Sequence, residues 1–379
     1  MSAYGVEEFE NVGIAKYAVL ETVKNYVPIR EKPSESAKRI THLPLGVVLF
    51  SLQESENYFL VELNEENKFY INKKFVEVQA IIPEKRLGNV DEMIFQDKKD
   101  RYIINLKTEF LPPFVMKEEG NNLNITFYDI HFDPTNAKIE KKISNFSLTD
   151  KIANEFEIKY QNLEQNKPFF GYDVQKYDDG YKIIIKKAPK IDQTKLLKGI
   201  NVLVDAGHGG AESGVCANNL KEKKINLQIS KKLKKELKKR GAKVYMTRTK
   251  DKTVPLYDRV QMAKEKDIDI LLSIHQNSLA DRSKVEFKHG AGTYYYQTQA
   301  KPLAQSIQKH LLHETKFKDD GVNYASFVLT RPTLPVSVLI ECGYLICEFE
   351  AKCLKNKKFQ NKVAKAIARG TAQYLKDNF

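Results

Sequence analysis

The sequence predicts an α/β fold with a mostly parallel sheet flanked by helices in its C-terminal part, preceded by two small all-β domains. Short β-rich runs broken by turn residues fill the first half. After Gly199, apolar strand patterns alternate with helical ones, which implies right-handed crossovers and a parallel sheet. We expect domains at residues 17–80, 90–188 and 199–379, with residues 189–199 as a linker.

Composition indicates a folded protein of two or three domains. The chain has 379 residues, 42% of them hydrophobic, which is enough to bury a substantial core. No apolar stretch approaches the roughly 18 residues of a membrane span. The first residues, a polar lead-in, lack the basic-then-apolar build of a signal peptide. We therefore expect no transmembrane segment and either a cytosolic protein or a mature or trimmed form.

The chain is basic, with a net charge of +13, so anionic partners have to be considered. Much of the excess lies in a helix expected at residues 223–240, where Ile225, Ile229, Leu233 and Leu237 recur every fourth residue. The lysines fall on the other faces, as in a solvated amphipathic helix. No nucleic-acid-binding motif accompanies them, so nucleic acid is not an expected partner.

Four cysteines lie in the last half, at Cys216, Cys342, Cys347 and Cys353. A disulfide framework would be denser and more evenly spread. The last three offer metal ligands in principle, but their spacing matches no zinc signature. We therefore expect Cys342, Cys347 and Cys353 to be buried free thiols.

The first β region has strand-like runs at residues 17–20, 46–50, 58–61 and 69–71, a spacing typical of a small barrel. Val27-Pro28-Ile29-Arg30-Glu31-Lys32-Pro33 stands where bacterial SH3 domains have an arginine-bearing "NVR" turn, and Leu43-Pro44-Leu45-Gly46 matches their "L-x-x-G" step. The region thus resembles a bacterial SH3 domain, although the family's tryptophan is missing. That family usually binds cell-wall peptides.

The second β region shows alternation of apolar and polar residues in two stretches, around Ile125 and around Ile158, and a further strand at residues 181–185 after a turn at residues 178–180. Period-two alternation predicts strands with one buried face. We expect a β-sandwich, which resembles the wall-targeting domains that precede some peptidoglycan hydrolases.

The third region alternates strands and helices. Strands are expected at residues 201–205, 243–247, 268–274, 292–296 and 335–341, and helices at residues 223–240, 256–266, 300–313 and 359–376.

Three of these strands run into a potential ligand or acid/base group. The strand at 201–205 leads to His208, the strand at 268–274 to His275, and the last strand to Glu341. Carboxyl ends of parallel strands meet at one edge of a sheet, so these side chains should gather there. Glu222, at the start of the lysine-rich helix, is the fourth candidate.

Two imidazoles and a carboxylate form a ligand set of catalytic zinc that leaves one position for water. A glutamate that is not a ligand can then accept the proton of the attacking water. Glu341 is notable because a carboxylate placed directly after an apolar strand needs a partner, a metal or a raised pKa.

Five motifs of the third region occur together: Asp205-Ala206-Gly207-His208-Gly209-Gly210; Lys221-Glu222-Lys223; Thr247-Arg248 with Arg259; Ser273-Ile274-His275-Gln276-Asn277; and Ile340-Glu341-Cys342-Gly343-Tyr344-Leu345. They resemble the motifs of zinc-dependent N-acetylmuramoyl-L-alanine amidases of the amidase-3 type. The resemblance implies that His208, Glu222 and His275 bind Zn²⁺ and that Glu341 is the catalytic carboxylate. We assign Asn277 to substrate binding and expect Arg248 and Arg259 to serve structure.

The resemblance also implies the substrate and its location. The expected reaction cleaves the amide bond between N-acetylmuramic acid and L-alanine of the peptidoglycan stem peptide, in the periplasm or cell wall. A regulatory protein is expected to act through the β-domains. Some relatives carry an inhibitory helix between the positions of His275 and Gly292, and this chain has too few residues for it. We therefore expect an active site that is open without an activator.

Three alternatives stay open at this point. His289 is the one other histidine close enough in sequence to His275 to be a rival ligand. A zinc peptidase acting elsewhere on the stem peptide would use the same residues. A noncatalytic wall-binding or scaffold protein would retain the fold with an inactive site.

Overall fold

The structure is a computed structural model that describes residues 10–11, 18–64, 66–79, 87–138, 143–151, 154–163, 167–277 and 289–379. It divides into two compact units. One comprises residues 1–166 and 174–184, and the other residues 167–173 and 185–379. None of the described helices is both long enough and apolar enough to cross a membrane. Most of the predicted lead-in, residues 1–16, lies outside the described residues.

The N-terminal sheet has the strand order β4-β3-β7-β6-β5-β2-β8, with β1 paired to β5. Its elements are β1(Glu10–Asn11), β2(Ala18–Thr22), β3(Val27–Arg30), β4(Arg39–Leu43), β5(Val48–Glu54), β6(Tyr58–Glu62), β7(Lys68–Asn72), η1(Lys73–Phe75) and β8(Val76–Val78). The expected strands at 58–61 and 69–71 are confirmed. The segment compared with an "NVR" turn, residues 27–33, begins as strand β3 and continues as a bend over residues 31–33. Arg30, the last residue of β3, is buried and donates Nη1–H to the carbonyl of Ala37 at 2.8 Å.

The second β region consists of two sheets, with orders β13-β9-β10-β18-β17 and β11-β12-β16-β15; β14 pairs with β9. Their elements are β9(Gly88–Asp97), β10(Arg101–Thr108), β11(Phe114–Glu119), β12(Asn122–Tyr128), β13(Ile130–His131), η2(Pro134–Asn136), β14(Ala137–Lys138), β15(Phe146–Lys151), β16(Glu155–Gln161), β17(Tyr172–Tyr177) and β18(Gly180–Lys186). The alternating residues of β12 and β16 point inward as expected, because Ile125 and Ile158 are buried. Phe127 contacts both Phe114 and Tyr181 in an aromatic core.

A six-stranded sheet of order β22-β19-β23-β26-β24-β25 forms the centre of the C-terminal unit. Its strands are β19(Asn201–Ala206), β22(Lys243–Met246), β23(Ile270–Asn277), β24(Ala291–Tyr295), β25(Asp319–Tyr324) and β26(Val336–Tyr344), and β20(Cys216–Ala217) and β21(Leu220–Lys221) form a separate pair. Neighbouring strands are parallel except that β24 runs antiparallel to β26. The sequence did not predict β25.

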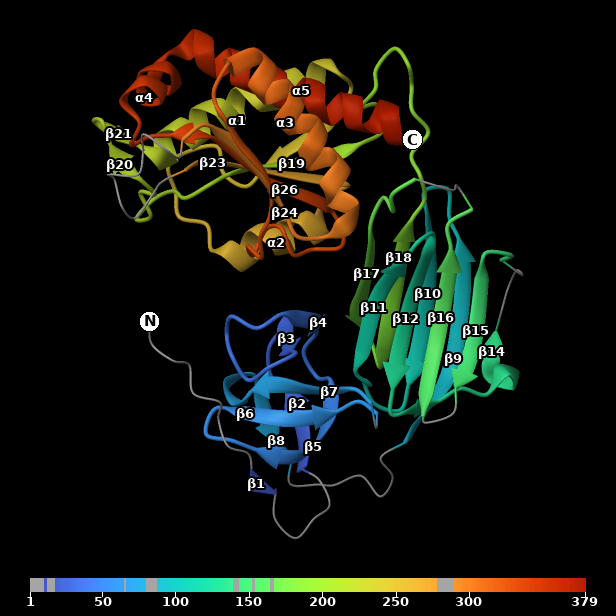
Figure 1. The fold of residues 1–379 in the computed structure, drawn as a ribbon. Coiled ribbons are helices and arrows are strands. Elements are labelled where there is room, and N and C mark those ends of the chain that lie inside the picture. Colours follow the sequence, from blue (N-terminus) through green and yellow to red (C-terminus); the bar gives the residue numbers. More distant parts are fainter. Residues whose placement is uncertain are drawn as a thin grey trace. The chain divides into compact units, whose positions relative to one another are not determined.

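Helices cover both faces of this sheet. They are α1(Glu222–Lys239), α2(Leu256–Glu265), η4(Thr298–Ala300), α3(Lys301–Thr315), α4(Glu348–Lys355) and α5(Lys357–Asn378). Figure 1 shows α1, α3 and α5 together on one side of the sheet and α2 on the other. The apolar stripe predicted for the lysine-rich helix is confirmed, because Ile225, Ile229, Leu233 and Leu237 are all buried in the core. That core fixes α1, and hence its first residue, against the sheet.

The predicted linker contains neither a strand nor a helix, but it is packed onto the C-terminal unit. Leu197 is fully buried in the core, and its N–H donates to the carbonyl of Arg240 at 3.0 Å. The end of the linker is therefore part of this unit.

Candidate metal centre and active site

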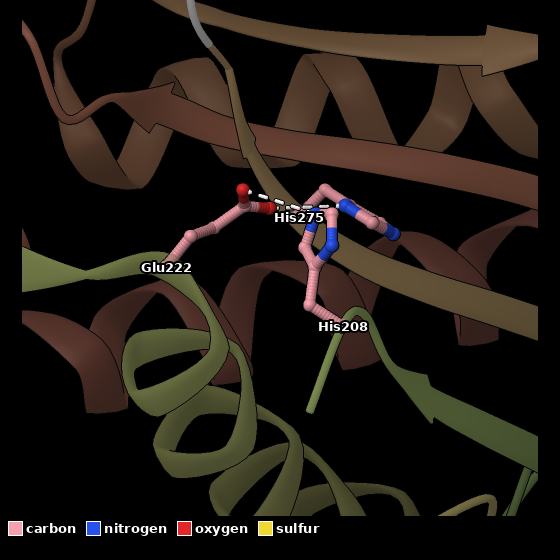
Figure 2. Close-up of side chains that lie close together, drawn as sticks. All are labelled: His208, Glu222 and His275. Atoms are coloured by element: carbon pink, nitrogen blue, oxygen red, sulfur yellow. Dashed lines mark hydrogen bonds and ion pairs between the residues drawn. The ribbon is translucent and has the colours of Figure 1, made fainter. Parts of the chain in front are cut away.

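His208, Glu222 and His275 converge from three segments (Figure 2). His208 lies two residues beyond the end of β19, Glu222 is the first residue of α1, and His275 belongs to β23. Glu222 Oε2 lies 3.1 Å from His208 Nε2, and Glu222 Oε1 lies 3.0 Å from His275 Nδ1. One ligand atom from each residue lies within 4.8 Å of the other two. The structure thus brings together the three residues predicted as ligands.

The backbone around His208 leaves room for this arrangement. His208 itself has a left-handed φ of 59°, which turns the chain sharply after β19. A Cβ at Gly207 would overlap the His275 imidazole, and one at Gly214 would overlap the Glu222 carboxylate. Glycine is therefore required at both positions for the imidazoles and the carboxylate to meet.

Glu222 is held rigidly. It is 2% exposed, and it accepts hydrogen bonds from the N–H groups of Val215 and Gln276 and from the Asn226 amide at 2.9 to 3.1 Å. Burial alone would raise the pKa of Glu222, but the hydrogen bonds and charges of the two histidines hold it well below the usual range. Glu222 is thus a carboxylate, the form that binds a cation.

A buried ion pair between Arg259 and Asp205 supports the loop that carries His208. Arg259 Nη1 lies 2.6 Å from Asp205 Oδ1, and both side chains are almost completely buried. Arg259 also donates to the carbonyls of Ala206 and His208, while Arg248 donates to those of Ala206 and Gly207. The two arginines thus bind backbone, as expected for a structural role.

Glu341 lies beside the metal-ligand cluster. It is paired with His275 in the register of β26 and β23. Its Oε2 is inaccessible to solvent and has no hydrogen-bond partner among the residues that the structure describes. Removal from water raises the pKa of Glu341 to about 8; His275 opposes this shift, and Glu222 and Asp320 add to it. A carboxyl group with this pKa exchanges protons near neutral pH. Glu341 and His275 are not at the strand ends as predicted, because β26 continues to Tyr344 and β23 to Asn277.

Asn277 belongs to a polar cluster next to Glu341. Its amide donates to the Tyr344 hydroxyl at 2.9 Å and lies 3.3 Å from Asp320 Oδ2 and 3.4 Å from the Tyr294 hydroxyl. The Tyr344 hydroxyl donates to Asp320 Oδ2 at 2.8 Å. Sequence reasoning did not find Asp320 or Tyr294, because neither lies in one of the quoted motifs. Only the tertiary fold brings them to Asn277.

His289 does not join the first cluster. Among the described residues it groups with Cys347 and Glu350 instead. The four cysteines are free. Of the three expected to be buried, Cys342 is buried but Cys347 and Cys353 are partly exposed, so the expectation is wrong for these two; Cys216 is exposed. The region where some relatives carry an inhibitory helix falls largely in residues 278–288, outside the described residues.

The known proteins that this chain resembles match it over about half of its length. Residues 202–373 match the profile of the N-acetylmuramoyl-L-alanine amidase family. An uncharacterized protein of Bacillus subtilis, YqiI, is 35% identical over 192 residues, which are 49% of this chain and 90% of YqiI. The N-acetylmuramoyl-L-alanine amidase CwlM of Bacillus licheniformis is 30% identical over 46% of this chain and 68% of CwlM.

A further relative is larger than the shared region. The N-acetylmuramoyl-L-alanine amidase LytC of Bacillus subtilis is 34% identical over 182 residues, which are 47% of this chain but 36% of LytC. The residues matched by the family profile, 202–373, lie in the C-terminal unit and include His208, Glu222 and His275. The chain therefore belongs to the N-acetylmuramoyl-L-alanine amidase family of hydrolases.

Proposed function

We propose that residues 199–379 form a zinc-dependent catalytic domain in which His208, Glu222 and His275 hold the metal and Glu341 transfers protons. The observation that carries the proposal is the convergence of two imidazoles and a buried carboxylate, with a carboxyl group of raised pKa opposite one of the imidazoles. This donor set is one that zinc takes in hydrolases. The glycines at 207 and 214, where a Cβ would fill the space, fit the same assignment.

The reaction is hydrolysis of the amide bond between N-acetylmuramic acid and L-alanine of the stem peptide, the activity named for the family. Zinc would supply a Lewis acid for the carbonyl and a water of lowered pKa. Glu341 accepts a proton from the attacking water and returns a proton to the nitrogen of the leaving alanine. The products are the lactyl carboxylate on the glycan and a free N-terminal alanine on the peptide.

Asn277 and its polar cluster orient the substrate. The amide nitrogen of Asn277 is held by Tyr344 and Asp320, so the orientation of this side chain is fixed before a substrate binds beside it. The regions at 17–80, which resembles an SH3 domain, and 90–188 serve as wall-binding or regulatory modules. With peptidoglycan as its partner, the enzyme acts in the periplasm or cell wall.

The test measures zinc content and digestion of purified peptidoglycan for the wild type, His275→Ala and His313→Ala. His313 is 77% exposed on α3, so its substitution controls for loss of a histidine as such. We expect His275→Ala to lose both activity and the zinc of this site, and His313→Ala to retain both. Full activity of His275→Ala would overturn the proposal.

Analysis of the products identifies the bond. Release of peptides that begin with L-alanine from an intact glycan supports the amidase. Release of shorter peptides would show instead a zinc peptidase that acts elsewhere on the stem, and stoichiometric zinc without any digestion would favour a noncatalytic wall-binding protein.

A further inference from the structure

We propose that His289, Cys347 and Glu350 form a second metal site, which takes a divalent cation of the zinc class and is distinct from the site at His208. Their ligand atoms, an imidazole nitrogen, a thiol sulfur and a carboxylate oxygen, all lie within 4.8 Å of one another. Zinc binds these three groups in proteins. The proposal goes beyond the hydrolase function, because none of these residues belongs to the first cluster.

The carboxylate of this second site is buried and oriented. Glu350, in the first turn of α4, is 1% exposed. Its Oε1 lies 2.8 Å from His289 Nδ1, and its Oε2 accepts a hydrogen bond from the Tyr344 N–H at 2.7 Å. A buried carboxylate requires such partners, and they leave Oε1 facing the imidazole. The side chain is therefore already placed to act as a ligand.

The thiol distinguishes this cluster from a simple ion pair. Cys347 is the N-cap of α4, is partly exposed and free, and caps no backbone N–H with its side chain. Its main chain is fixed, because its N–H donates to the carbonyl of Tyr344 at 3.2 Å and its carbonyl accepts from Ala351 at 2.8 Å. An ion pair of His289 and Glu350 forms without a sulfur atom nearby. A third metal ligand, in contrast, has to lie close to both of these groups, as the Cys347 sulfur does.

The spacing of the three ligand atoms suits a tetrahedral ion. Metal–ligand bonds of about 2.0–2.3 Å place tetrahedral ligand atoms about 3.3–3.8 Å apart, and the three ligand atoms here all lie within 4.8 Å of one another. Small side-chain rotations would therefore bring them to the separations that one ion requires. The first cluster also has a carboxylate oxygen close to an imidazole nitrogen, since Glu222 Oε1 lies 3.0 Å from His275 Nδ1. In both clusters a carboxylate in the first turn of a helix faces an imidazole from another segment.

An ion at this site would brace the segment that follows the catalytic strand. It would link the turn between β26 and α4 to His289, which precedes β24. Glu350 also binds the backbone of Tyr344, whose hydroxyl contacts Asn277. The three protein donors leave a fourth position for water, and the expected role is structural support of the cluster that contains Asn277.

Cobalt separates the two sites, because thiolate ligands give Co²⁺ an intense near-ultraviolet charge-transfer band and the first cluster contains no thiol. The full chain is stripped of metal, reduced and titrated with Co²⁺. The variants are His275→Ala, which disables the first site, Cys347→Ser and Glu350→Gln, with Cys216→Ser as the control for an exposed thiol. Bound zinc per chain is measured in parallel after dialysis.

We expect the wild type, His275→Ala and Cys216→Ser to show the thiolate band, and Cys347→Ser to lack it. Glu350→Gln should weaken cobalt binding by at least about tenfold, because a charged ligand is lost. Zinc should fall from about two ions per chain to about one in either His275→Ala or Cys347→Ser. A wild type without the band, or an unchanged band in Cys347→Ser, would overturn the second site, whatever the activity of the first.

Discussion

His275 and Glu341 occupy paired positions on the neighbouring parallel strands β23 and β26. This register places a candidate metal ligand and a candidate proton-transfer group side by side, and each shifts the other's titration. Burial alone would lower the pKa of His275, but Glu222, Glu341 and Asp205 raise it above the usual range. The sheet itself therefore fixes the distance between the metal site and the acid/base group.

Glu341→Gln should abolish most turnover and leave the metal in place. A glutamine keeps the shape of the side chain but cannot exchange the proton, and general acid–base catalysis contributes about 10²–10⁴-fold. The loss should appear in kcat for peptidoglycan digestion, with zinc content unchanged. Glu348→Gln, at an exposed position of α4, should retain wild-type activity. A Glu341→Gln enzyme with normal kcat would exclude the proposed role.

Glu222→Gln should weaken metal binding at the first site. Glu222 contacts both imidazoles through its two oxygens, so an amide would remove an anionic ligand and a hydrogen-bond acceptor together. We expect zinc affinity to fall by at least about tenfold, measured by competition with a chelator in the Cys347→Ser background. Glu212→Gln, at an exposed position of the loop between β19 and β20, should bind zinc as the wild type does. Equal affinities for the two variants would contradict the assignment.

Asp205→Asn should destabilise the C-terminal unit by about 3–5 kcal/mol, because it leaves the buried guanidinium of Arg259 without its charged partner. Urea unfolding measures this loss. Removing Lys352, which pairs with Glu348 on the surface of α4, should cost about 0.5 kcal/mol or less. Similar losses of unfolding free energy for the two variants would show that the buried pair stabilises the protein no more than the exposed pair does.

The same pair predicts a pH effect with a defined sign. Burial would raise the pKa of Asp205, but Arg259, Ser273, His275 and Thr247 hold it below the ordinary value. A carboxyl group with a depressed folded-state pKa stabilises the protein fully above its unfolded pKa of about 3.9, and this stability is lost as the pH falls toward the folded value. The difference in unfolding free energy between wild type and Asp205→Asn should therefore shrink below about pH 4.

The sequence predicted those parts of the site that are encoded locally. The apolar runs before His208, His275 and Glu341 and the four-residue repeat of α1 are local patterns. They predicted that these three side chains gather at one edge of the sheet, with Glu222 at the start of the neighbouring helix. Strand direction has no such local pattern, because an alternating segment reads the same in both orientations. The sequence therefore did not reveal that β24 runs antiparallel to β26.

Groups assembled from distant segments were also beyond the sequence. His289 and Glu350 are separated by 61 positions, and neither stands in a pattern that points to the other. The partly exposed state of Cys347 depends on its place at the start of α4, a helix that was not predicted. Such contacts follow from packing between elements, which periodicity does not describe.

Asn277→Ala should impair substrate positioning without loss of the metal. The Asn277 amide is fixed by the Tyr344 hydroxyl at 2.9 Å, and a neutral hydrogen bond contributes about 0.5–1.5 kcal/mol. We therefore expect kcat/KM for a muropeptide substrate to fall by about two- to tenfold, and Tyr344→Phe, which frees the amide, to give a smaller loss in the same direction. Asn361→Ala, on the exposed face of α5, serves as the control. A fall in bound zinc in Asn277→Ala would instead place this residue among the groups that hold the metal, and unchanged kinetics would remove it from the site.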